Sequence, residues 1–142
     1  MDRMRAFFAG EFPADQREYV DVMRAVVEHP DADTAGLEAI PFNCFGFGLF
    51  PLGRVGDLDS PCISVWYDDP HLIYTVQLRR HRDRHILALH DVFSPEEAWA
   101  AVARCLPRLL AESERSPVGG SRVSSEWLTQ ISPITNFDSD RS

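Results

Sequence analysis

The densest cluster of chemically active side chains is a basic run at the tip of a predicted hairpin. It holds four arginines and two histidines, namely Arg79, Arg80, His81, Arg82, Arg84 and His85. Planar guanidinium groups bind phosphate or carboxylate oxygens in pairs. The run therefore predicts a site for a phosphate-bearing ligand or for an acidic patch of a partner. A charged hairpin tip that only blocks edge pairing and keeps the chain soluble is the alternative interpretation.

The strand that leads into this tip extends the candidate surface. Alternation over residues 72–78 puts apolar side chains on one face and a more polar set on the other, namely His71, Thr75, Gln77 and Arg79. This pattern is typical of an antiparallel strand with one face in water. Trp66 and Tyr67 must point to opposite faces. An exposed Trp66 beside Gln77 and Arg79 would form an interface hot spot, whereas core packing of the aromatic rings is the alternative.

Metal and cofactor chemistry find little support in the sequence. His81 and His85 flank one turn, but the arginines around them repel a cation. His90 and Asp91 are strand neighbours that point to opposite faces, so they cannot converge on one ion. Gly46-x-Gly48 lacks the third glycine and the following helix of a dinucleotide fingerprint. We therefore expect neither a metal nor a cofactor.

Nucleophilic catalysis is also poorly supported. Cys44 and Cys62 lie in apolar predicted strands and Cys105 in a predicted helix. A reactive thiol usually lies at an exposed, electropositive position. These three cysteines are instead expected to be small, buried apolar residues. No pair has the Cys-x-x-Cys spacing of a zinc or redox site. No catalytic residue is assigned, and an enzyme with an unrecognised motif is kept only as the last alternative.

Composition sets the broad class. The 142 residues carry 22 acidic and 14 basic side chains, for a net charge of −8. This balance argues against nucleic-acid binding, which depends on a positive surface. No stretch approaches the roughly 18 apolar residues of a membrane span, so a cytoplasmic location is expected. All basic residues are arginine, a bias that suggests a GC-rich, bacterial genome.

The acidic charge is concentrated near the N-terminus. Residues 11–38 hold eight acidic side chains against Arg17 and Arg24. A solvated face is the simplest explanation of such a run. The alternative explanation is that this acidic run forms a docking face for a basic partner.

Two amphipathic helices and a meander should position these groups. We expect one helix over 15–29, capped by Asp15 and Glu18, and another over 95–112, capped by Ser94 and Glu97 and kinked or broken near Cys105 by Pro107. Strands are predicted over 42–50, 62–67, 72–78 and 86–92. Gly46 and Gly48 share one strand face and permit close approach of a backbone, an aromatic ring or a ligand.

The sequence therefore predicts an α+β domain over 1–131 with an antiparallel sheet of about four strands and two main helices on one face. Residues 126–131 are expected to dock Trp127, Leu128 and Ile131 on the core, and 132–142 to form a flexible polar tail. The expected function is a small acidic module that neutralises or chaperones a partner protein, like an immunity protein, an antitoxin or a secretion chaperone. The alternative is a phosphate-ligand-binding domain. Self-association into a homodimer is compatible with both.

Overall fold

The computed structural model describes residues 2–34, 36–57, 59–68, 72–80 and 86–115. These residues form three α-helices, one short 3-10 helix and a single five-stranded sheet. In chain order the elements are α1 (Asp2–Phe8), η1 (Ala14–Gln16), α2 (Arg17–Val27), β1 (Leu37–Asn43), β2 (Gly46–Pro51), β3 (Pro61–Asp68), β4 (Ile73–Arg80), β5 (Ile86–Val92) and α3 (Pro95–Arg115).

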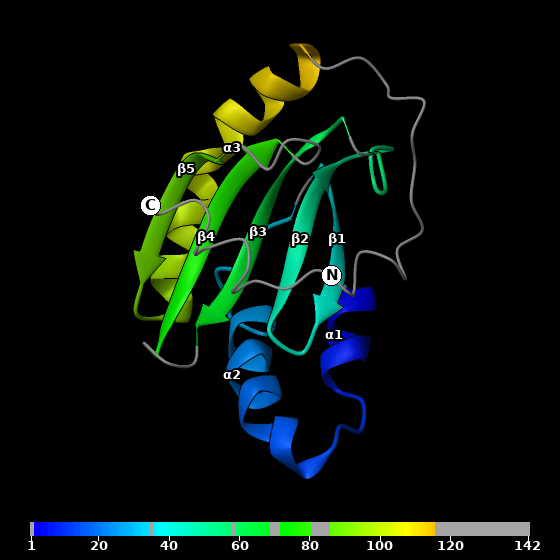
Figure 1. Ribbon diagram of the computed structural model, residues 1–142, viewed down its shortest axis with the longest axis vertical. Helices are drawn as coiled ribbons and strands as arrows, with labels where there is room; N and C mark the ends of the chain where they lie inside the picture. Colours follow the sequence, from blue (N-terminus) through cyan, green and yellow to red (C-terminus); the bar gives the residue numbers. More distant parts are fainter. Residues whose placement is uncertain (1, 35, 58, 69–71, 81–85, 116–142) are drawn as a thin grey trace.

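The sheet is an antiparallel meander in the order β1-β2-β3-β4-β5. Helices α2 and α3 pack on one face of it, and α3 crosses behind β4 and β5 in Figure 1. The predicted α+β class is confirmed, and the predicted strands at 62–67, 72–78 and 86–92 correspond to β3, β4 and β5. The sheet has one strand more than expected, and α1 is an additional helix.

The additional strand comes from a hairpin where the sequence predicted one strand over 42–50. That prediction is wrong, because the chain reverses between Asn43 and Gly46. The side chain of Asn43 accepts a hydrogen bond from the Phe45 amide at 2.8 Å, which closes a local turn. Pro41 concealed β1 in the sequence, but it is tolerated because β1 is an edge strand.

A continuous apolar core joins the helices to their face of the sheet. Its sheet side includes Phe47, Leu49, Ile63, Val65, Val76 and Leu78. The indole of Trp99 on α3 stacks on Phe47 and donates a hydrogen bond to the Val26 carbonyl at 2.8 Å. This single side chain therefore ties α3 to both α2 and the sheet.

Local signals set the ends of the helices. At α3 the Ser94 hydroxyl accepts the Glu97 amide at 3.1 Å, and the Glu97 carboxylate accepts the Phe93 amide at 3.3 Å. The predicted cap is thus formed. Of the predicted kink or break near Cys105, the break is wrong, because α3 runs through Pro107 as one helix of 21 residues. Pro107 is exposed, so the carbonyl that loses its partner can bond to water.

The start of α2 differs from the prediction. Asp15 lies within η1, and neither η1 nor α2 has a side-chain hydrogen bond at its N-cap. Instead, Arg24 fixes this region from inside α2, since its guanidinium donates to the Phe8 carbonyl at 2.7 and 3.0 Å. Arg24 therefore holds the end of α1 against α2.

Two glycines allow aromatic rings to lie flat on β2. A methyl group at Gly46 would overlap the ring of Trp66, and one at Gly48 would overlap the ring of Phe42. The two rings stack on each other with centroids 5.2 Å apart. The sequence allowed close approach of a backbone, an aromatic ring or a ligand, and an aromatic ring approaches each glycine, with the backbone carbonyl of Val65 also close to Gly46.

We expect Gly48→Ala to lower the free energy of unfolding by about 1–3 kcal/mol, because the Phe42 ring must leave its position. Urea unfolding followed by circular dichroism measures this change. Phe42→Leu in the same chain should recover part of the loss, since it removes the clashing edge. Equal stability of wild type and Gly48→Ala would contradict this packing.

Candidate functional site

The sheet face opposite the helices carries a row of buried polar side chains. Register pairs Cys62 with Arg79, Ser64 with Gln77, and Trp66 with Thr75 across β3 and β4. Ser64, Trp66, Thr75 and Gln77 are fully buried, and Arg79 is 1% exposed. We call this set, together with Cys62, the polar row.

The polar row corrects one prediction from the sequence. Thr75, Gln77 and Arg79 were expected on a face open to water, and Trp66 was considered as an exposed anchor. All four are buried, so the exposed, wet strand face is wrong. Strand alternation correctly separates the two faces of the sheet, but it does not indicate what covers each face. The side chain of Arg80 and residues His71, His81, Arg82, Arg84 and His85 lie outside the described part of the structure, so the phosphate site at the tip stays a prediction.

Most of the polar row lacks hydrogen bonds from the described residues. Ser64 Oγ, Trp66 Nε1, both polar side-chain atoms of Gln77, and Nε and Nη1 of Arg79 have no partner within the described ranges. Thr75 differs, because its hydroxyl donates to Asp91 at 3.1 Å. A buried polar atom without a partner costs roughly 1–3 kcal/mol, and more when it belongs to a charged group. The row is therefore suited to meet a further polar or anionic group.

Cys62 lies at the end of this row, directly opposite Arg79. Complete burial raises the pKa of its thiol, and the nearby positive charge of Arg79 opposes only part of that effect. Burial likewise raises the pKa of the Cys44 and Cys105 thiols. All three thiols are therefore held in the protonated form that does not attack electrophiles.

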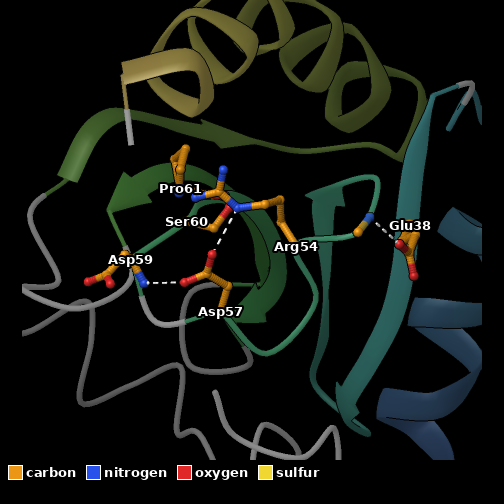
Figure 2. A network of polar contacts seen from close by, with 7 residues as sticks. Glu38, Arg54, Asp57, Asp59, Ser60 and Pro61 are labelled. Carbon is orange, nitrogen blue, oxygen red and sulfur yellow. Dashed lines mark hydrogen bonds and ion pairs between the residues drawn. The ribbon is translucent and has the colours of Figure 1, made fainter. Parts of the chain in front are cut away.

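The loop between β2 and β3 is held by a buried ion pair (Figure 2). Arg54 Nε lies 2.9 Å from a carboxylate oxygen of Asp57, which is fully buried. The other oxygen of that carboxylate accepts the Asp59 amide at 2.9 Å. Glu38 on β1 accepts the Gly53 amide and anchors the start of the loop. Val55, in the middle, packs against a small apolar cluster that includes Phe42 and Trp66.

A second candidate site is a groove beside the first half of α3. Its volume is about 420 Å³, and it is lined by Leu37, Trp99, Val102 and Leu106 together with Asp31, Asp33 and Glu96. Leu37, Trp99 and Val102 are buried and form an apolar floor, whereas the three carboxylates are exposed at its rim. We call it the acid-rimmed groove. The sequence placed Asp31 and Asp33 in an acidic run and Trp99, Val102 and Leu106 in a core stripe, but it gave no sign that the two meet.

The described residues do not bring a catalytic or metal-binding set together. Cys62 lies on the face of the polar row, whereas His90 pairs with Val76 on the helix-facing side, so this pair cannot act as a nucleophile and its base. His71 and His85 lie outside the described residues. Within the described ranges no group of three or more histidine, cysteine or acidic side chains could hold a metal ion.

Comparison with protein-family models, with curated proteins and with solved structures finds no match to this chain. Among the described helices, none is sufficiently long and apolar to cross a bilayer. The function must therefore be argued from the two sites themselves.

We expect the free energy of unfolding to fall as the pH rises above about 8.5, the ordinary pKa of a thiol. The folded pKa of each cysteine is raised, so the unfolded chain loses its thiol protons first. The stabilising effect is complete below the unfolded pKa and is lost toward the folded one, at up to about 1.4 kcal/mol per pH unit for each thiol. Urea unfolding between pH 7 and 10 measures it. A flatter profile is expected for Cys62→Ala, and an unchanged slope in that variant would contradict the assignment.

Asp57→Ala should lower the free energy of unfolding by about 3 kcal/mol, because the largely buried guanidinium of Arg54 then loses the Asp57 carboxylate with which it forms an ion pair. Asp21→Ala is the matched control, since it removes an ion pair of the same spacing, with Arg24, from the surface. That control should cost less than about 1 kcal/mol. Similar losses for the two variants in chemical denaturation would show that the loop does not depend on the buried pair.

Proposed function

We propose that the protein is a binding module that neutralises or chaperones another protein, and that the acid-rimmed groove receives a basic, amphipathic segment of that partner. The groove is the observation that carries the proposal. It joins an apolar floor to exposed carboxylates, which is the combination that such a segment complements.

The geometry of the groove supports this role. Trp99 fixes the floor rigidly, because its ring is stacked on Phe47 and its indole nitrogen is bonded to Val26. A rigid floor loses little conformational entropy when a partner binds. Asp31 and Asp33 come from the α2–β1 connection and Glu96 from the first turn of α3, so they line the groove from two elements. Cationic side chains of a bound segment can therefore find carboxylates contributed by both elements.

Charge supports the same role at longer range. The net charge of −8 attracts a basic partner and raises the rate of encounter. A protein that inhibits a toxin and one that shields an effector before secretion can both use such a surface. Inhibition would require the partner's active region to be covered, and chaperoning would require an aggregation-prone segment to be covered.

The test uses a synthetic probe, a fluorescently labelled helical peptide with leucines on one face and lysines on the other. We expect the full-length protein to bind it, with an affinity that falls as salt rises because the rim is charged. The variant Asp31→Asn/Asp33→Asn/Glu96→Gln should weaken binding at least about tenfold, which fluorescence anisotropy can measure.

The matched control removes three acidic charges far from the groove, in Asp2→Asn/Asp15→Asn/Glu18→Gln. It should keep most of the affinity, although its net charge becomes less negative by the same three charges, from −8 to −5. Equal weakening in both variants would show that only overall charge matters. No binding by the wild type would contradict the groove as a docking site.

A further inference from the structure

We propose that His29 makes the acid-rimmed groove sensitive to pH, because protonation of its imidazole withdraws Asp31 from the rim and releases a bound basic segment. This inference rests on the proposed function, since it concerns the regulation of the same groove. His29 is not one of the groove-lining residues, whereas Asp31 is. His29 is therefore a positioning residue, which acts on the bound segment through Asp31.

His29 begins a tight turn directly after α2. Its carbonyl accepts the Ala32 amide at 3.0 Å, and Pro30, whose ring fixes its φ angle, occupies the second position of the turn. The imidazole also takes part, since its Nδ1 accepts the Asp31 amide at 3.0 Å. Aspartate and asparagine side chains make the same kind of bond to the backbone two residues ahead of them. His29 therefore fixes the backbone that carries the Asp31 carboxylate.

The turn is also joined to the floor of the groove. The His29 amide donates to the Val26 carbonyl at 3.3 Å, and this carbonyl also accepts the indole N–H of Trp99 at 2.8 Å. Trp99 belongs to the floor and Asp31 to the rim. The hydrogen bond between the imidazole and the Asp31 amide therefore sets where this rim carboxylate lies relative to the floor.

The hydrogen bond from the Asp31 amide requires an Nδ1 that carries no proton. A neutral imidazole has one such acceptor, but in the protonated ring both nitrogens are N–H donors. One oxygen of the Asp31 carboxylate lies 3.9 Å from Nδ1, within easy reach of the new donor. Protonation thus breaks the bond to the Asp31 amide and favours an ion pair with the Asp31 carboxylate. Both changes make this carboxylate less available to a cation in the groove.

The charged groups around His29 are carboxylates. Within the described ranges, Asp31 is the one charged side chain in hydrogen-bond or ion-pair contact with the ring. Glu28 precedes His29 as the C-cap of α2, and Asp33 and Glu96 line the groove together with Asp31. Histidine is the side chain that ordinarily changes charge between pH 5 and 8. A bound cationic segment and the imidazolium compete for the same carboxylate, so each weakens the binding of the other.

The test measures binding of the leucine–lysine helical peptide to the full-length protein at pH 7.5 and pH 5.5 by fluorescence anisotropy. For the wild type we expect the Kd to rise at least about fivefold at the lower pH. In His29→Asn the side-chain oxygen can still accept the Asp31 amide but cannot take up a proton. The Kd of this variant should therefore change by less than about twofold. Any titration of the rim carboxylates is common to both proteins and does not affect the comparison.

The matched control is His90→Asn, which removes a histidine of β5 that is not one of the groove-lining residues. It should keep the pH dependence of the wild type. A second measurement needs no peptide, since the NMR signal of the Asp31 amide should shift with the same midpoint as the ring signals of His29.

Two outcomes would overturn this inference and leave the groove as a docking site. These are an equal pH dependence of peptide binding in the wild type and in His29→Asn, or an Asp31 amide signal that does not follow the His29 ring. Absence of peptide binding by the wild type at pH 7.5 would overturn the proposed function, and this inference with it.

Discussion

Complete burial of the central strand β3 is the constraint on which the rest of the structure depends. Each of its eight residues is buried, so both faces of the sheet must be covered around it. The helix-facing side is covered by an apolar core, whose side chains need no hydrogen-bond partners. The opposite side is half polar, so whatever covers it must also supply hydrogen bonds. The two faces of one strand therefore impose different demands on the remainder of the chain.

Much of this fold could be predicted from local patterns. Alternation in residues 62–92 identified three strands and their faces, and the Ser94–Glu97 pattern identified the start of α3. The errors have local causes as well. Pro41 and Asn43 concealed a hairpin, and Pro107 suggested a break that an exposed position on α3 tolerates. In each case tertiary position, which the sequence does not display, decided the outcome.

The candidate sites were harder to predict. The sequence singled out Gln77, Arg79 and Trp66 because their types suit binding, and the structure does bring them onto one face. Their burial was missed, since alternation distinguishes two faces but does not say which is dry. The acid-rimmed groove was missed because Asp31 and Trp99 are 68 positions apart in the chain. Only the packing of α3 beside the α2–β1 connection joins them.

Pro41 has a consequence for the behaviour of the protein in concentrated solution. It lies on β1, at one edge of the sheet, opposite Phe47. A proline has no N–H to offer, so a strand from another molecule would find a missing donor midway along this edge. Unprotected edges are templates for intermolecular pairing and fibril growth. The residue that disguises β1 as a loop in the sequence therefore also makes the sheet a poor seed for aggregation along that side.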